Sequence, residues 1–167
     1  SDDSAVQDSK WYLGEFFWET AERNGIKTAS FYWPGSEVSL EHRHPTYYKE
    51  FEQSFPYKQR IDTVISWLEM PYHERPKFIT TYFSLTDSYG HRYGTNSEKT
   101  NGAIAKLDSI ANYLTRKLKS TSVADSTNII ILSDHGMTNV SKNRSINIEQ
   151  IIEDDLNNGY NKEPVNV

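Results

Sequence analysis

The stretch "KFITTYFSLTDSYGHRYG", residues 77–94, joins a strand-like run to polar residues of the kind that bind metal ions. Its first half is β-branched and aromatic with little polar alternation, which is typical of a strand buried on both faces of a parallel sheet. We therefore predict a strand over residues 78–85. Asp87 and His91 follow it, and we place them in a loop that contains Gly90.

A second stretch repeats this arrangement nearer the end of the chain. "NIIILSDHGM", residues 128–137, opens with an apolar run that predicts a buried strand over 128–132, and Asp134 and His135 come directly after it. Apolar residues at helical spacing predict a helix over 97–120 between the two strands. Helices that alternate with apolar strands indicate an α/β fold, with a mostly parallel sheet flanked by helices and right-handed crossovers.

The remaining elements are predicted from periodicity and from Gly and Pro positions. We expect helices over 11–25, 57–70 and 145–156, a strand over 26–33, and a long loop over 37–56.

Composition narrows the possible functions. The 167 residues can form one domain or part of a larger one, and the net charge of −5 argues against binding of a nucleic-acid duplex, though not of a small nucleotide. The chain has no Cys, so any metal must be held by His and carboxylate side chains. No apolar run is long enough to span a membrane, and no signal peptide opens the segment.

The two strands, as parallel neighbours, would bring their polar residues to one edge of the sheet, where α/β proteins bind ligands. Asp and His ligands suit Zn²⁺, with Mn²⁺ or Fe as alternatives. A catalytic zinc takes about three protein ligands, so four residues are too many for one open site and too few for two. They predict a two-metal centre with further ligands elsewhere, of the kind that catalyses phosphoryl transfer. The alternative is ordinary surface and turn chemistry, because Asp and Gly also commonly end strands. The four residues are Asp87, His91, Asp134 and His135.

At these residues the sequence resembles the nucleotide pyrophosphatase/phosphodiesterase family of the alkaline phosphatase superfamily. The resemblance implies an incomplete alkaline phosphatase-like fold, in which residues 1–167 are the central part of a catalytic domain. It also implies a two-zinc hydrolase that cleaves nucleotides through a Thr nucleophile, with the nucleophile segment upstream and the last metal-binding His downstream. Asp87 and His91 would hold one zinc ion, and Asp134 and His135 the other. The matching stretches are "WYLGEFFWETA", "FYWPGSE", "SFPYKQRID", "ERPKFITTYFSLTDSYGHRYG" and "NIIILSDHGM".

The same resemblance implies a nucleobase pocket. Trp33 and Pro34 match its wall, and Phe51 stands where the family often has a Tyr that stacks on the base. Glu37 occupies the position of a usual Asp that contacts the base edge. The alternative for Trp33 and Phe51 is packing in the core.

Three functional interpretations remain open at this point. The first is a nucleotide phosphodiesterase or pyrophosphatase with a small-molecule nucleotide substrate. The second is a hydrolase of choline phosphodiesters or phosphonates from the same superfamily, and the third is a binding protein that kept the fold. We expect the segment alone to be inactive. The family implies a periplasmic, cell-surface or secreted location, and the absence of Cys favours a bacterial source.

Overall fold

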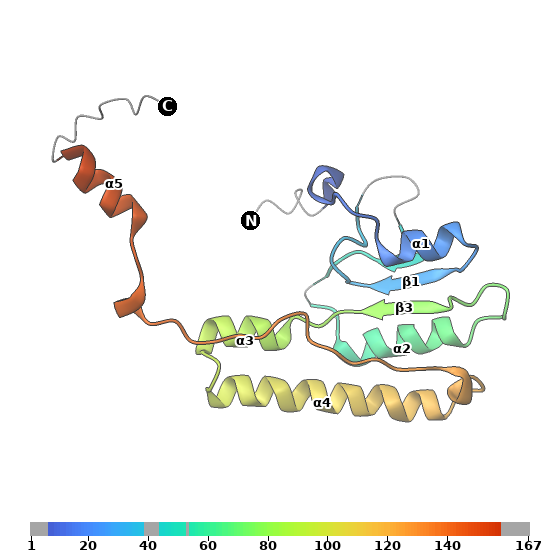
Figure 1. The fold of residues 1–167 in the computed structure, drawn as a ribbon. Helices are drawn as coiled ribbons and strands as arrows, with labels where there is room; N and C mark the ends of the chain where they lie inside the picture. The colour runs from blue at the N-terminus through green and yellow to red at the C-terminus, as the bar shows by residue number, and fades with distance from the viewer. Residues whose placement is uncertain (1–6, 39–43, 53, 158–167) are drawn as a thin grey trace. The chain divides into compact units, whose positions relative to one another are not determined.

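The computed structural model describes residues 7–38, 44–52 and 54–157, and the chain divides into two units, Ser1–Gly136 and Met137–Val167. Within the described part of the first unit, three strands form a parallel sheet in the order β2-β1-β3, which confirms the α/β prediction (Figure 1). The central strand pairs Ala29 with Tyr47 on one side and with Ile79 on the other. The strands are β1 (Thr28–Phe31), β2 (Tyr47–Lys49) and β3 (Phe78–Thr81).

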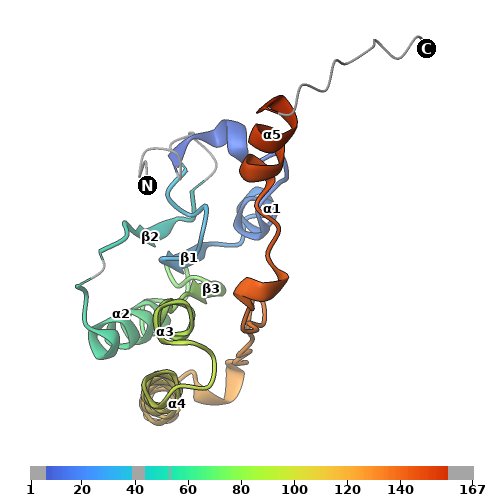
Figure 2. The same ribbon diagram turned by 90° about the vertical axis from the view of Figure 1, so that its left-hand side faces the viewer.

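Helices cover both faces of this sheet. Helix α1 contacts β1 from one side, and α2 lies on the opposite face with α4 packed against it (Figures 1 and 2). The helices of the first unit are α1 (Phe17–Arg23), α2 (Tyr57–Leu68), α3 (Leu85–Tyr93) and α4 (Glu98–Lys119).

Two apolar clusters hold the layers together. In the first, Phe31 of β1 is fully buried and packs with Val64 and Trp67 of α2. In the second, Ile61 of α2 packs with Ile110 of α4. Helix α2 therefore contributes to both clusters and joins the sheet to the outer helix.

The predicted helix over 97–120 is confirmed as α4. The Ser97 hydroxyl caps its start by accepting a hydrogen bond from the Thr100 amide at 3.1 Å. Basic side chains occupy its last turn, where they complement the negative end of the helix dipole. The predicted strand over 26–33 is confirmed in shorter form as β1.

The prediction of an uninterrupted loop over 37–56 was wrong, because β2 lies within it. This strand has only three residues, and they pair along one edge of β1 with two of the three side chains exposed. An edge strand of this length is too short to show a hydrophobic pattern in the sequence.

The prediction of a strand over 78–85 was too long, and the loop after it is a helix. Strand β3 ends at Thr81, and α3 begins at Leu85 and carries both Asp87 and His91. An acidic residue in its first turn and basic residues in its last turn suit the helix dipole. Helix α3 ends with its C-cap at Gly94, where φ is 84°, a backbone conformation that favours glycine.

The predicted buried strand over 128–132 is not formed. These residues belong to no helix or strand, and Ile130 and Ile131 are 83% and 72% exposed. An apolar run becomes a strand only when a neighbouring strand pairs with its backbone, and within the described residues this run pairs with none of the three strands.

The second unit contains α5 (Ile148–Asn157), which agrees with the predicted last helix. The Asn147 side chain accepts a hydrogen bond from the Gln150 amide at 3.2 Å and caps its start. In the described part of the chain, no helix is both long and apolar enough to cross a membrane.

Candidate functional site

Asp87 and His91 lie one turn apart on α3. Their i, i+4 spacing puts both side chains on one face of the helix. The Nε2 atom of His91 is 3.4 Å from Oδ1 of Asp87. Helical geometry, rather than a loop, therefore brings this pair together.

Asp134 and His135 follow the extended run 128–132 and reach the same place. The Nε2 atom of His135 is 3.9 Å from Oδ1 of Asp87 and 3.6 Å from Oδ2 of Asp134. All four predicted metal-binding residues are thus brought together, although no strand precedes the second pair.

The His135 ring is oriented by its own backbone. Its Nδ1 atom lies 3.0 Å from the carbonyl oxygen of Gly136, which can only accept, so Nδ1 carries the hydrogen. In the neutral ring, Nε2 therefore carries no hydrogen and has a free electron pair. This atom is the one near Asp87. The Gly136 carbonyl, followed by the charges of Asp134 and Asp87, raises the pKa of His135.

The donor set contains side chains of the type that bind zinc, and one pair has a separation compatible with a shared ion. Two ligands at about 2.1 Å from a tetrahedral zinc lie roughly 3.4 Å apart, and this is the separation of His91 Nε2 and Asp87 Oδ1. It is longer than an ordinary hydrogen bond. In metal-bound histidines, the ring nitrogen that does not bind the metal commonly donates to a backbone carbonyl. At His135, Nδ1 makes such a contact with the Gly136 carbonyl. The four side chains do not form a metal site as they stand, since the described residues contain no group of three or more His, Cys, Asp or Glu that could hold a metal ion.

Tyr82 is a neighbour that the sequence analysis missed. Its amide donates to the Phe31 carbonyl at 3.0 Å, which extends the pairing of β1 and β3 by one residue. Burial raises the pKa of its hydroxyl, and the charges of Asp134 and Asp87 raise it further.

The four predicted nucleobase residues lie at the end of β1 and after β2. Trp33 is half-buried and Pro34 is exposed, and they form a turn closed by a hydrogen bond from the Ser36 amide to the Trp33 carbonyl at 3.0 Å. Gly35 in this turn has a φ of 85°. A Cβ atom there would lie 2.6 Å from Cε1 of Phe16, so this position requires glycine in both conformation and space.

Glu37 and Phe51 meet across the two strands. The Phe51 amide donates a hydrogen bond to the Glu37 carboxylate. Burial raises the pKa of Glu37, this hydrogen bond lowers it, and the charge of Glu50 raises it again, with a net increase. Phe51 is 55% exposed, and its ring lies 5.1 Å from the ring of Tyr32. Phe51 therefore presents an aromatic surface to solvent and belongs to neither apolar cluster of the described residues.

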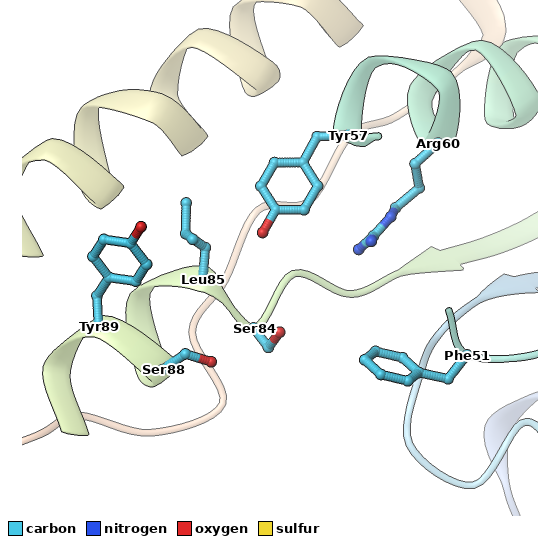
Figure 3. Close-up of a pocket in the computed structure, with 7 residues that line it drawn as sticks. All are labelled: Phe51, Tyr57, Arg60, Ser84, Leu85, Ser88 and Tyr89. Atoms are coloured by element: carbon cyan, nitrogen blue, oxygen red, sulfur yellow. The ribbon is translucent and has the colours of Figure 1, made fainter. Parts of the chain in front are cut away.

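A pocket of about 180 Å³ lies between Phe51 and the start of α3 (Figure 3). Arg60 of α2 is buried to 4% exposure, and its guanidinium points into this pocket. The sequence does indicate that Arg60 is buried, because it lies four residues before Val64 and so falls on the buried face of the predicted helix. The pocket is lined by Phe51, Tyr57, Arg60, Ser84, Leu85, Ser88 and Tyr89.

Comparison with known proteins places this chain in a family. The model of the type I phosphodiesterase/nucleotide pyrophosphatase family matches residues 1–165. The chain is 36% identical over 141 residues to venom phosphodiesterase 2 of Crotalus adamanteus, which covers 84% of this chain and 17% of that protein. It is 37% identical over 145 residues to human ectonucleotide pyrophosphatase/phosphodiesterase family member 1, which covers 87% of this chain and 16% of that protein.

A solved structure agrees with this result. An inactive variant of murine ectonucleotide pyrophosphatase/phosphodiesterase 5, in complex with AMP, superposes with a TM-score of 0.73 at 30% identity. The match covers 80% of this chain and 35% of that one. The chain spans about a sixth of the length of the curated relatives it matches. It belongs to the type I phosphodiesterase/nucleotide pyrophosphatase family.

Proposed function

We propose that the protein is a zinc-dependent hydrolase that cleaves phosphodiester or pyrophosphate bonds of nucleotides. The observation that carries this proposal is the convergence of the two Asp-His pairs, with His91 and His135 both directed at Asp87. Two bound zinc ions would stabilise the attacking and leaving oxygens of a phosphoryl group. Asp87 and His91 would hold one ion, and Asp134 and His135 the other.

Each ion then has two ligands from the described residues, which is fewer than a catalytic zinc requires. We propose that residues 1–167 are the central part of a catalytic domain. The Thr nucleophile and the remaining ligands would come from chain outside these residues. The segment alone should then bind zinc weakly and be inactive.

The nucleotide part of the proposal rests on the surface formed by Phe51 and Glu37. An exposed aromatic face suits stacking of a base, which is worth about 1–3 kcal/mol and accepts any base. Glu37, with a raised pKa and an amide of Phe51 as partner, would contact the base edge, and Trp33 and Pro34 would form the wall. The AMP in the murine relative supports a nucleotide ligand.

An extracellular or cell-surface location is consistent with relatives named as ectonucleotide and venom enzymes. We propose the same for this protein, with the periplasm as the equivalent in a bacterium. The relatives named above are animal proteins, and a bacterial source stays a prediction from the absence of Cys.

The test is hydrolysis by the full-length chain with zinc present. We expect p-nitrophenyl TMP to be cleaved much faster than p-nitrophenyl phosphate, because the diester carries a base and a nucleoside. His135→Ala should reduce this activity by orders of magnitude, while His73→Ala, an exposed imidazole in the turn before β3, should not. A chain that prefers the monoester, or a choline phosphodiester, would overturn the assignment.

A further inference from the structure

Arg60 is a buried cation in an unusual environment. Only 4% of the residue is exposed, and its guanidinium lies over aromatic rings, 4.5 Å from the centroid of Tyr32 and 4.7 Å from that of Phe83. Its Nη1 atom donates to the Tyr82 carbonyl. Arginine is rarely buried without a carboxylate partner, because removing its charge from water is costly.

In the described part of the chain, Arg60 forms no ion pair and its Nε atom has no hydrogen-bond partner. Burial lowers the pKa of Arg60, and the groups that oppose this effect are Tyr32 and Tyr57 rather than a carboxylate. The guanidinium keeps its charge at neutral pH. Among the described residues, aromatic rings surround this charge but no carboxylate balances it.

The pocket in front of Arg60 has the size and lining for an oxyanion. Its volume of about 180 Å³ is several times the roughly 30 Å³ that one water occupies. The nine-residue helix α3 begins at its edge, and the Ser84 side chain makes no capping hydrogen bond there. The first amides of a helix attract anions. Asp87 lies in the same turn, but its carboxylate faces His91 and His135 instead.

We propose that this pocket is a second anion site, in which Arg60 and the start of α3 bind a phosphate group. Ser84 and Ser88, which line the pocket beside Arg60, would donate hydrogen bonds to the phosphate oxygens (Figure 3). The choice of phosphate over carboxylate rests on the proposed function. The phosphate is either part of a nucleotide or inorganic phosphate.

Calorimetric titration of the full-length chain with inorganic phosphate, at constant ionic strength and with EDTA present, tests this site apart from the metals. We expect saturable binding. Ser88→Ala should weaken it several-fold, and Arg60→Ala by at least about tenfold, as for loss of a charge-assisted hydrogen bond. Ser109→Ala, a substitution of an exposed serine on α4, should leave it unchanged.

No phosphate binding in EDTA would overturn the proposal, as would wild-type affinity in Ser88→Ala. Since Arg60→Ala removes a buried side chain, the exposed Ser88 provides the variant that keeps the fold. Addition of AMP identifies the source: competition with phosphate assigns the site to a nucleotide phosphate, and independent binding assigns it to the free anion. Hydrolysis of p-nitrophenyl TMP by the same protein without phosphate binding would reject the pocket alone, and binding without hydrolysis would reject the proposed function alone.

Discussion

Replacement of Phe51 by alanine separates substrate binding from folding. Phe51 is 55% exposed, so about the remaining 45% of its surface contributes to packing. For an aromatic side chain of roughly 200 Å² this is about 90 Å², or about 2 kcal/mol at roughly 25 cal/mol per Å². This value is an upper bound, and it is small beside the total stability of a domain. We therefore expect Phe51→Ala to fold.

The loss in nucleotide binding should be of similar size but visible in a different measurement. Stacking on a base is worth about 1–3 kcal/mol, which corresponds to about a 5- to 150-fold decrease in kcat/KM for p-nitrophenyl TMP. Bis-p-nitrophenyl phosphate has no base, so its kcat/KM should fall much less. Phe17→Ala on α1 is the matched control, because Phe17 is 84% exposed and not among the predicted site residues.

The assay is steady-state kinetics of the full-length chain with zinc on both substrates. A loss confined to the nucleotide would support the base-stacking role of Phe51. Equal losses on the two substrates would refute it and would mean that Phe51 supports the fold. The nucleotide assignment would then rest on family membership alone.

Three further predictions concern stability, titration and metal. Glu22→Gln should lower the free energy of unfolding, measured with urea, by about 1–3 kcal/mol, because the Glu22 carboxylate accepts from the buried Thr28 amide at 2.7 Å. Burial raises the pKa of Glu22, but the hydrogen bonds outweigh this effect and lower the pKa below 4.5. The stabilisation by the Glu22 carboxylate is therefore complete above pH 4.5 and is lost as the pH falls through the pKa of Glu22 in the folded protein. A stability difference between wild type and Glu22→Gln that persists in strong acid would contradict this prediction. In metal-free protein, NMR titration should give His135 a pKa above 6.5 because of the Gly136 carbonyl and the Asp134 charge, and Asp134→Asn should lower it. Removal of metal with a chelator should abolish hydrolysis, and added zinc should restore it; activity that survives complete chelation would exclude the two-zinc proposal.

The sequence predicted the elements whose patterns are long or strongly apolar. Helix α4 shows regular apolar spacing over 22 residues and a Ser97 cap, and it was found nearly to the residue. The three residues of β2 offer no such pattern, because two of them are exposed at a sheet edge. The long apolar pattern of α4 could be recognised in the sequence, whereas β2 is too short to show one.

The convergence of the two Asp-His pairs was expected from parallel strands, and it arises in another way. The spacing of Asp87 and His91 is equally suited to a helix, where i, i+4 residues share a face, and the sequence alone did not decide between helix and loop. The apolar run 128–132 has strand composition, but pairing depends on a neighbour that composition does not show. Arg60 was missed because a charged residue on a buried helix face becomes meaningful only when its surroundings are known.

The exposed run 128–132 makes aggregation the main risk in preparing a protein of residues 1–167. Its side chains from Ile129 to Leu132 are 40–83% exposed, uncharged and β-prone, and its backbone is unpaired in the described structure. Such segments pair between molecules and nucleate fibrils. A charge at the most exposed position, as in Ile130→Lys, should lower the light scattering of this protein during concentration without disturbing the core, since Ile130 belongs to neither apolar cluster.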